Sequence, residues 1–342
     1  MLSVQVNLRT ITKNVATIKK HLSNGTKFCA VVKDNAYGFG LVRISKLLAP
    51  LVDCFAVATV TEGVTLRQIG IQNDILILGI CDDIPTAIQK DLIVTIESVT
   101  QAHFLIKNKL HPRIHLAINT SMNRFGISSI HELRETLHLL TSERMEGIYT
   151  HLAYESDHPD EIQPALRCFK KFTQVCQKYF PHVIIHAGCS GTINYQAAHF
   201  DMMRIGKALY GGIRETQTAL TVTSQIVAIK KLKPGATVGY NGTFVASQPI
   251  VIGIVRGGYA NGIPTQFSGN VKVLVGKQPC PIIGRVCMDY FFIDVSKITN
   301  PLAQKVTIIS SQNGQTLLEI AKQTKMLTCD LLLKLTIPNS HN

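Results

Sequence analysis

The sequence predicts an α/β protein built as a (β/α)8 barrel, followed by a second, mainly antiparallel β domain. Over about the first 210 residues, short apolar runs alternate with stretches of helical spacing. Such alternation is typical of parallel strands joined by right-handed helical crossovers. From about residue 221, short β-branched runs are separated by glycine, proline and asparagine turns, which indicates antiparallel strands.

Eight short apolar runs in the first part fit buried barrel strands. They cover residues 28–32, 54–58, 75–78, 92–96, 114–118, 147–150, 183–186 and 202–205. Helical spacing predicts helices over 41–49, 60–69, 98–107, 129–140 and 159–179. Eight repeats in roughly 200 residues fit a closed TIM-like barrel, and we expect its last helix to be short.

The second part predicts a smaller β-rich domain. Its expected strands cover residues 225–228, 249–255, 271–275, 281–285, 291–295 and 306–309, and one helix is expected at 316–324. The N-terminal piece 3–8 reads as a single strand that could pair with this domain. The predicted division is therefore a barrel at 9–215 and a β-rich domain made of 1–8 and 216–342.

Composition excludes several classes of protein. The chain has 342 residues, of which 46% are hydrophobic and 17% charged, so it is not a mainly disordered chain. No uncharged apolar run reaches the roughly 18 residues of a membrane span, and the N-terminus lacks an apolar signal core, which predicts a cytoplasmic protein. The 9 cysteines form no C-x-x-C pair, so we expect reduced thiols and no metal site.

The net charge of +13 raises the question of nucleic-acid binding. The basic residues are spread along the chain, and neither a basic arm nor a long basic run is present. This distribution favours a generally basic surface, or a small anionic ligand, over a nucleic-acid groove.

The strongest local signal is the run AVVKDNAYGFG at 30–40. In it, Lys33 ends the first barrel strand just before a glycine-rich turn. Active sites of such barrels lie at the C-terminal ends of the strands. A lysine there, with apolar residues behind it, can act as a nucleophile or base. An ordinary solvated lysine is the alternative, and position alone favours that alternative.

This run resembles the A-V-V-K-x-N-A-Y-G-x-G signature of alanine racemases, a family of pyridoxal-phosphate (PLP) enzymes with a barrel and a C-terminal β domain. The resemblance continues in the same order over more than 250 residues. The matching runs are EGIYTHLA at 146–153, HAGCS at 186–190, MRIG at 203–206 with YG at 210–211, GYANG at 258–262 and GRVCMD at 284–289.

The resemblance implies how PLP would be held. Lys33 would form the Schiff base, and Tyr37 would contact the phosphate. Ser190 and Gly206, after the seventh and eighth barrel strands, would bind the phosphate at the usual anion site of this barrel. Arg204 would face the pyridine nitrogen and keep it unprotonated, because a guanidinium does not give up its proton. A surface ion pair is the alternative for Arg204.

The resemblance also implies the remaining active-site residues. His151 would support Arg204 by a hydrogen bond and belong to the cofactor site, although a neutral core histidine is the alternative. Tyr259 would enter the partner subunit's site as an acid/base. Arg124 and Met288 would hold the substrate carboxylate. The alternative for Tyr259 is an aromatic residue of a turn without a catalytic role. The alternative for Met288 is packing within a strand.

The implied protein is a homodimeric alanine racemase with shared active sites. It would interconvert L- and D-alanine through a PLP imine and two bases, Lys33 and Tyr259, and supply D-alanine for cell-wall peptidoglycan. A racemase for another small amino acid such as serine, or a PLP-binding protein with reduced catalysis, are the alternatives. No nucleic acid and no membrane are expected as partners.

The sequence departs from the family pattern at several positions. The lysine that many members carbamylate is Ala117, and the following aspartate is Asn119, so Arg124 lacks two negatively charged supports. Asn119 or a bound chloride are the candidates to replace them. The segment 335–342 contains neither the tyrosine nor the arginines of the family pattern, which predicts weaker binding of PLP or substrate.

Overall fold

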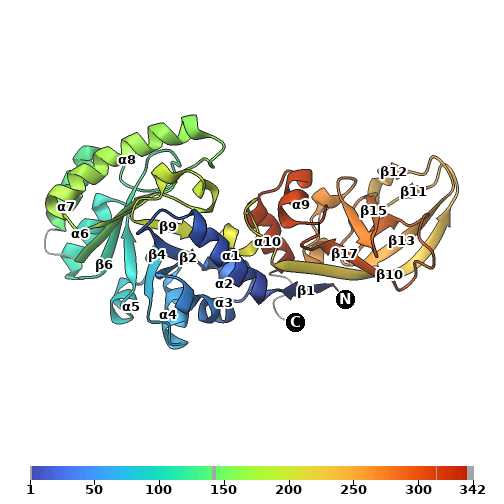
Figure 1. The fold of residues 1–342 in the computed structure, drawn as a ribbon, viewed down its shortest axis with the longest axis horizontal. Helices are drawn as coiled ribbons and strands as arrows, with labels where there is room; N and C mark the ends of the chain where they lie inside the picture. The colour runs from blue at the N-terminus through green and yellow to red at the C-terminus, as the bar shows by residue number, and fades with distance from the viewer. Residues whose placement is uncertain (1, 141–143, 313, 337–342) are drawn as a thin grey trace. The chain divides into compact units, whose positions relative to one another are not determined.

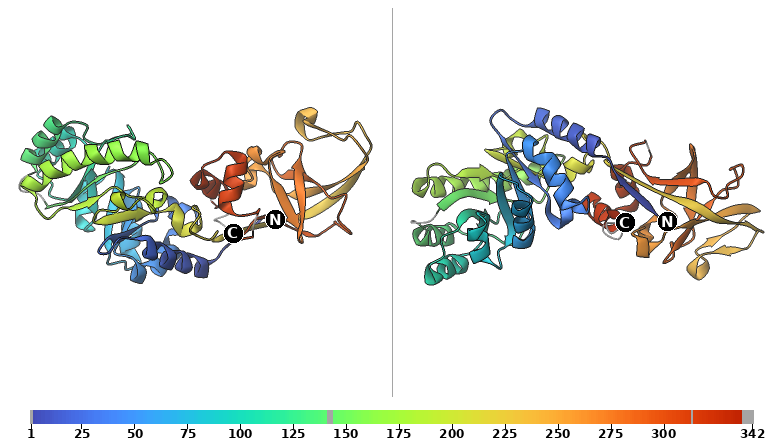
Figure 2. Two further views of the ribbon diagram at one scale, coloured as in Figure 1. Left: turned by 45° about the horizontal axis from the view of Figure 1, so that its top comes forward. Right: turned by 90° about the horizontal axis from the view of Figure 1, so that it is seen from below.

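The computed structural model describes residues 2–140, 144–312 and 314–336, and the chain divides into two compact units. Each unit has its own sheet, shown as ribbons in Figures 1 and 2. We call the first the barrel unit; it comprises Val15–Ala36 and Gly40–Ala208. We call the second the β unit; it comprises Met1–Asn14, Tyr37–Phe39 and Leu209–Asn342.

The barrel unit contains a parallel sheet of eight strands in the order β8-β7-β6-β5-β4-β3-β2-β9. The eight predicted strands are confirmed, because short apolar runs without alternation suit strands that are buried on both faces. Their bounds are β2 (Lys27–Val31), β3 (Cys54–Val57), β4 (Asp74–Ile80), β5 (Ile93–Ile96), β6 (Arg113–Ile118), β7 (Arg144–Thr150), β8 (Ile184–His186) and β9 (Met202–Ile205).

The barrel closes between β8 and β9, the two ends of this strand order. Arg204 forms an isolated parallel bridge with Cys189, and its backbone amide donates to the Gly188 carbonyl at 3.0 Å. The connection from β8 to β9 consists of two 3-10 turns, Ser190–Thr192 and Gln196–Ala198. The sequence predicted a short last helix, and this connection contains short 3-10 turns in place of an α-helix.

The predicted barrel helices are also present, and Figure 2 shows them flanking the strands. Thr59, Ser98 and Ser129 cap three of them by accepting a hydrogen bond from the amide three residues later. The helices are α3 (Leu41–Leu48), α4 (Val60–Gln68), α6 (Val99–Asn108), α7 (Ile130–Leu139) and α8 (Pro159–Tyr179). A sixth, α5 (Ile84–Gln89), was not predicted, because six residues are too few to show a helical period.

The β unit contains a sheet of seven strands in the order β1-β10-β13-β16-β15-β14-β17, and β10 also pairs with β17. All of its pairings are antiparallel, as predicted. The strands are β1 (Ser3–Val6), β10 (Leu220–Leu232), β13 (Ile250–Arg256), β14 (Lys272–Val275), β15 (Gln278–Ile283), β16 (Tyr290–Asp294) and β17 (Lys305–Ile309). The pairing of the N-terminal strand with this sheet is confirmed, with Val4 opposite Val222.

Smaller elements complete the β unit. Strands β11 (Thr237–Val238) and β12 (Phe244–Val245) form a separate hairpin. The predicted helix is confirmed as α9 (Leu317–Thr324), which begins with a capping box of Thr316 and Glu319. Helix α10 (Thr328–Thr336) was not predicted, and α1 (Leu8–His21), whose first residues belong to this unit, was missed as well. Residues 337–342, which carry most of the departure at the C-terminus, lie outside the described residues.

The helices in the described part of the chain are too short or too polar to cross a membrane.

A cluster of charges ties the N-terminal ends of the barrel strands together. Arg113 at the start of β6 is only 10% exposed in its side chain, and its Nη2 lies 2.6 Å from Asp74 Oδ1 and 2.8 Å from Glu146 Oε2. Burial lowers the pKa of Arg113, but the hydrogen bonds to these two carboxylates raise it overall. The cluster lies at the end of the barrel that serves stability in this fold, opposite the end that carries active sites.

We expect Arg113→Met to lower the free energy of unfolding by about 2–3 kcal/mol, because the partly buried carboxylates lose their partner. Arg144→Met is the matched control: Arg144 contacts the same Glu146 at 3.3 Å but is 63% exposed. Its loss should cost about 1 kcal/mol or less. Urea denaturation of both variants measures the difference, and equal losses would contradict a structural role of the buried arginine.

Candidate active site

The C-terminal ends of the barrel strands gather the residues that the sequence singled out. Lys33 follows β2, His151 follows β7, Ser190 follows β8, and Arg204 lies within β9. Arg124 lies in the loop after β6. Because the eight strands are parallel, these positions share one rim of the barrel.

Lys33 opens an unusual left-handed turn. The next four residues, Asp34 to Tyr37, all have φ of 54–55°, a conformation that costs roughly 1–2 kcal/mol for each residue with a side chain. Part of this cost is offset by two hydrogen bonds of Asn35. Its side-chain Oδ1 accepts from the Leu41 backbone amide at 2.8 Å, and its backbone amide donates to Glu62 Oε1 at 3.2 Å. Such strain is typical of functional sites, where it fixes a side chain in one place.

The Lys33 side chain itself is 36% exposed, and its Nζ lies 3.9 Å from Asp34 Oδ2. Its amine is therefore accessible to a ligand and is not enclosed in a tight ion pair. This placement fits a lysine that bonds to a ligand at the barrel rim.

Arg204 is the most deeply buried charge of the rim, with 3% exposure. Its Nη2 donates to the Thr150 carbonyl at 2.7 Å and to the Ala187 carbonyl at 3.2 Å, and its guanidinium lies 5.0 Å from the Tyr149 ring centre. Burial lowers its pKa. The alternative of a surface ion pair is wrong, because the partners of the guanidinium in the described residues are all neutral.

The imidazole that contacts Arg204 is that of His186, with 2.6 Å between Arg204 Nη1 and His186 Nδ1. We expected this bond from His151, and the described residues do not contain it. The sequence contained a signal for His186, since it ends the strand β8 and is the first residue of the HAGCS run, but its role was not predicted. His186 Nε2 lies 2.9 Å from Nδ1 of a second buried histidine, His115.

The hydrogen bonds fix the tautomers of this pair. A guanidinium can only donate, so His186 Nδ1 accepts and its proton is on Nε2. That proton is then donated to His115 Nδ1, which leaves the His115 proton on Nε2. Burial holds the pKa of His186 well below its usual value and lowers that of His115 to about 3, and the charge of Arg204 acts in the same direction on both. Both rings are therefore neutral.

His151 lies at the same rim but faces a small pocket. Burial, together with the charges of Arg204, Arg124 and Lys33, lowers its pKa to about 3. Three cations thus act on His151, which identifies this end of the barrel as electropositive. A ligand with negative groups would be attracted to it.

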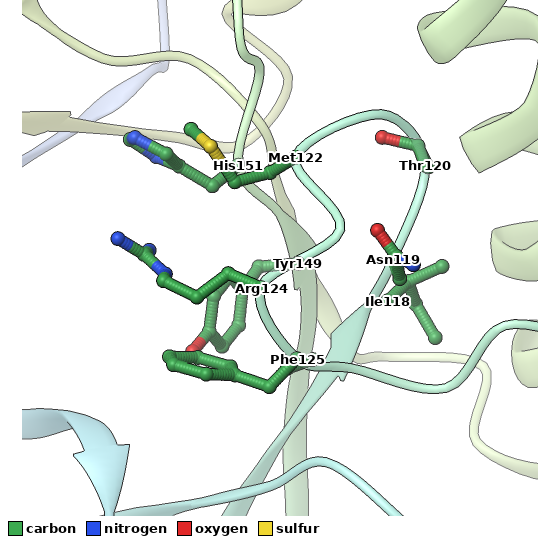
Figure 3. Close-up of a pocket in the computed structure, with 9 residues that line it drawn as sticks. Ile118, Asn119, Thr120, Met122, Arg124, Phe125, Tyr149 and His151 are labelled. Carbon is green, nitrogen blue, oxygen red and sulfur yellow. The ribbon is translucent and has the colours of Figure 1, made fainter.

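The pocket of about 20 Å³ beside His151 is also lined by Ala117, Asn119, Arg124 and Phe125 (Figure 3). In Figure 3, Arg124 and His151 extend to one side of the loop and Asn119 to the other. The side-chain Nδ2 of Asn119 donates to Asn123 Oδ1 at 3.0 Å and to Ser128 Oγ at 3.3 Å. Its Oδ1 accepts from the backbone amide of Asn123 at 3.0 Å.

Asn119 therefore does not replace the missing support of Arg124, contrary to one of our two expectations. The guanidinium of Arg124 lies 4.9 Å from the Phe125 ring centre. Within the described residues it makes neither a hydrogen bond nor an ion pair. Arg124 is thus a cation that is free to bind an anionic ligand.

Ser190 is 4% exposed and joins the turn that follows β9, and we call this arrangement the cradle. Its Oγ accepts from the amides of Gly206 at 3.0 Å and Ala208 at 3.3 Å. Because the oxygen accepts twice, the hydroxyl hydrogen remains available to donate to a ligand. A serine hydroxyl and backbone amides at this place in the barrel are the groups that bind phosphate.

The other predicted site residues belong to the β unit. Tyr259 and Met288 are 44% and 51% exposed, on two loops joined by hydrogen bonds from the Tyr259 amide to the Cys287 carbonyl and from the Ala260 amide to the Met288 carbonyl, both 3.0 Å. The Tyr37 carbonyl accepts from Thr336 Oγ1 at 3.0 Å. Tyr259 and Met288 are accessible on their own unit, Tyr37 is half-buried, and the roles of all three stay predictions.

Two models of known domains cover the chain. The alanine racemase N-terminal domain matches residues 6–214, and the alanine racemase C-terminal domain matches residues 219–339. The chain belongs to the alanine racemase family. This assignment confirms the resemblance that the sequence motifs indicated.

Individual family members agree over nearly the whole chain. The alanine racemase of Streptococcus pyogenes serotype M6 is 35% identical over 97% of this chain and 95% of the relative. The solved biosynthetic alanine racemase of Pseudomonas aeruginosa is 27% identical, covers 98% of this chain and 97% of that one, and has a TM-score of 0.89. The alanine racemase of Bartonella henselae, solved with covalently bound pyridoxal phosphate, shares the fold at 24% identity and a TM-score of 0.87 over 98% of this chain and 97% of that one. The predicted fold class and the predicted family of isomerases are confirmed.

The neutral histidines make the stability of this alanine racemase family member sensitive to acid. In the unfolded chain a histidine titrates near pH 6.5, whereas the pKa of folded His115 and His151 is lowered to about 3. The unfolded state therefore binds more protons as the pH falls below about 6.5. Stability should be lost from there towards pH 3, by up to about 1.4 kcal/mol per pH unit for each histidine.

We expect His115→Gln to reduce this slope between pH 6 and pH 4 by about 1 kcal/mol per pH unit, because glutamine can still accept from His186 but does not titrate. Urea denaturation at several pH values measures the slope. His103→Gln is the control, since the His103 side chain is 59% exposed, and its slope should match the parent. An unchanged slope in His115→Gln would contradict a neutral buried ring at this position.

Proposed function

We propose that this chain interconverts L- and D-alanine with PLP as cofactor, and that the D-alanine serves cell-wall peptidoglycan. The observation that carries the proposal is the meeting of three features on one barrel rim: the accessible Lys33 amine, the buried Arg204 with neutral partners, and the Ser190 cradle. Membership of the alanine racemase family supports the reaction and the substrate.

The residues at this rim fit PLP. The Ser190 hydroxyl, whose hydrogen is left to donate while its oxygen accepts from the Gly206 and Ala208 amides, suits its phosphate, and Lys33 suits its aldehyde carbon. Arg204 suits its ring nitrogen, because a buried guanidinium offers a hydrogen-bond donor that does not lose its proton. Bound PLP would draw electrons from the alanine Cα and make the Cα proton acidic.

The protein's own groups would then orient the substrate and move the proton. Arg124 binds the alanine carboxylate and Met288 of the partner subunit borders it, so that Cα is held between two bases. Lys33 exchanges the proton on one face of Cα, and Tyr259 of the partner subunit exchanges it on the opposite face. Removal on one face followed by delivery on the other inverts the configuration.

This mechanism requires a homodimer with shared active sites. We infer that the barrel at 9–215 binds the cofactor and that the β-rich domain, 1–8 and 216–342, completes the site of the partner. The exposure of Tyr259 and Met288 on the β unit supports this arrangement. The free cysteines support a cytoplasmic location, where thiols stay reduced.

Mixed dimers test the reaction and the shared site together. Lys33→Ala and Tyr259→Phe should each lower the rate of D-alanine formation from L-alanine by at least about 10³-fold, since each removes one of two acid/base groups. When the two variants are mixed, one site of each mixed dimer regains both residues. We therefore expect activity to return to a substantial fraction of the parent rate.

The control is a mixture of Lys33→Ala with the double variant, in which both sites of each mixed dimer lack Lys33. Formation of mixed dimers is verified with two different affinity tags. Verified mixed dimers without recovered activity would place both residues in one subunit's site or remove Tyr259 from the mechanism.

The free guanidinium of Arg124 predicts a dependence on small anions. Ala117 adds only a methyl group beside it and Asn119 is bonded elsewhere, so a bound chloride is the remaining candidate to support Arg124. A carboxylate clamp displaced by about 1 Å can cost on the order of 10²-fold in rate. We expect the racemisation rate to rise when sodium chloride replaces sodium gluconate at constant ionic strength. Equal rates in both salts would show that Arg124 is already held in place.

A further inference from the structure

A lysine that neither the motifs nor the proposed mechanism use lies beside the phosphate cradle. Lys207 directly follows Gly206, so its backbone lies between the two amides that donate to Ser190. Its side chain is 18% exposed, and its Nζ forms an ion pair with Glu155 Oε1. Glu155 comes from the loop between β7 and α8.

Glu155 is in turn packed against the other side of the cradle, the turn Ser190–Thr192. A Cβ placed on Gly191 would lie only 2.7 Å from Glu155 Cγ and 3.2 Å from Glu155 Oε1, so the carboxylate covers this glycine. The next residue, Ser156, holds the loop there, since its amide and its hydroxyl donate to the Gly191 carbonyl at 2.8 Å and 2.9 Å. The loop that carries Glu155 is therefore held against this turn, while the Glu155 side chain itself stays 56% exposed.

A carboxylate against a phosphate-binding turn is electrostatically unfavourable. The phosphate of a bound ligand carries close to two negative charges at neutral pH, and like charges at short range repel by an amount that depends strongly on their surroundings. The ammonium group of Lys207 touches that same carboxylate and offsets its charge.

We propose that Lys207 and Glu155 form a charge-balancing pair that sets how tightly the cradle holds a phosphorylated ligand. Lys207 attracts the phosphate and Glu155 repels it. Their contact keeps the combined charge of the two side chains near zero. The inference rests on the proposed function in that the ligand is the phosphate of PLP. It assigns to this chain two residues that tune phosphate affinity and that do not take part in proton transfer.

The two members of the pair are predicted to act in opposite directions. Lys207→Met leaves the carboxylate uncompensated and should weaken PLP binding by about tenfold. Glu155→Gln removes the repulsion, keeps the shape of the side chain, and should tighten PLP binding by several-fold. The double variant should return to within about twofold of the parent, and Lys207→Arg should bind like the parent because it keeps the charge.

The experiment is a spectrophotometric titration of the full chain, freed of cofactor, with PLP and with pyridoxal, which lacks the phosphate. The pyridoxal affinity should be equal in all variants, because the pair acts only on the phosphate. A thermal-shift titration with inorganic phosphate, in the same variants, should show the same order of affinities.

Three results would overturn the proposal. Equal weakening by Glu155→Gln and Lys207→Met would mean that the pair is a mechanical link between two turns. Unchanged PLP and phosphate affinities in all variants would mean an ordinary surface ion pair. Equal effects on pyridoxal and PLP would place the effect away from the phosphate. A fourth result would separate the two proposals. If the parent and its variants bound inorganic phosphate in the predicted order of affinities but none of them bound PLP, the proposed function would fail while the charge-balancing pair would stand.

Discussion

One buried guanidinium sets the conditions at the functional end of the barrel. Burying a charge is costly unless its hydrogen bonds are satisfied, and Arg204 achieves this with the carbonyls of Thr150 and Ala187 and the ring of His186. These groups come from the ends of β7 and β8, whereas Arg204 comes from β9. The same cation that can meet a ligand therefore also joins three strand ends at the point where the barrel closes through a single bridge.

The neutral partners of Arg204 impose further requirements on the interior. His186 and His115 must stay uncharged and keep one tautomer each, because a second buried cation beside the guanidinium would be repelled. The His115 ring needs space, and Gly147 on the adjacent strand β7 supplies it: a Cβ there would lie 2.6 Å from the ring. The glycine in the EGIYTHLA run is thus explained by a histidine three residues into β6, a dependence that only the folded barrel brings together.

The sequence predicted the eight barrel strands and most of the helices because both depend on local patterns of apolar residues. Helix α5 was missed because it is short, although its Asp83 cap and Pro85 were readable signals. At the site, the strand-end positions of Lys33 and Arg204 were predictable from the barrel architecture and the motifs. The partner of Arg204 was not, because His151 and His186 both end strands, and only side-chain direction in three dimensions distinguishes them.

The two ends of the proposed ligand site differ in how their cations are paired. At the proposed phosphate end, Lys207 forms an ion pair with Glu155 beside the turn Ser190–Thr192. At the proposed carboxylate end, Ala117 and Asn119 replace charged residues of the family pattern, and Arg124 makes neither a hydrogen bond nor an ion pair within the described residues. A substrate carboxylate would then contribute the main negative charge near Arg124. Selective binding of the α-carboxylate of an amino acid would therefore depend on the unpaired Arg124 guanidinium. Retention of a phosphorylated cofactor would instead depend on the opposing charges of Lys207 and Glu155.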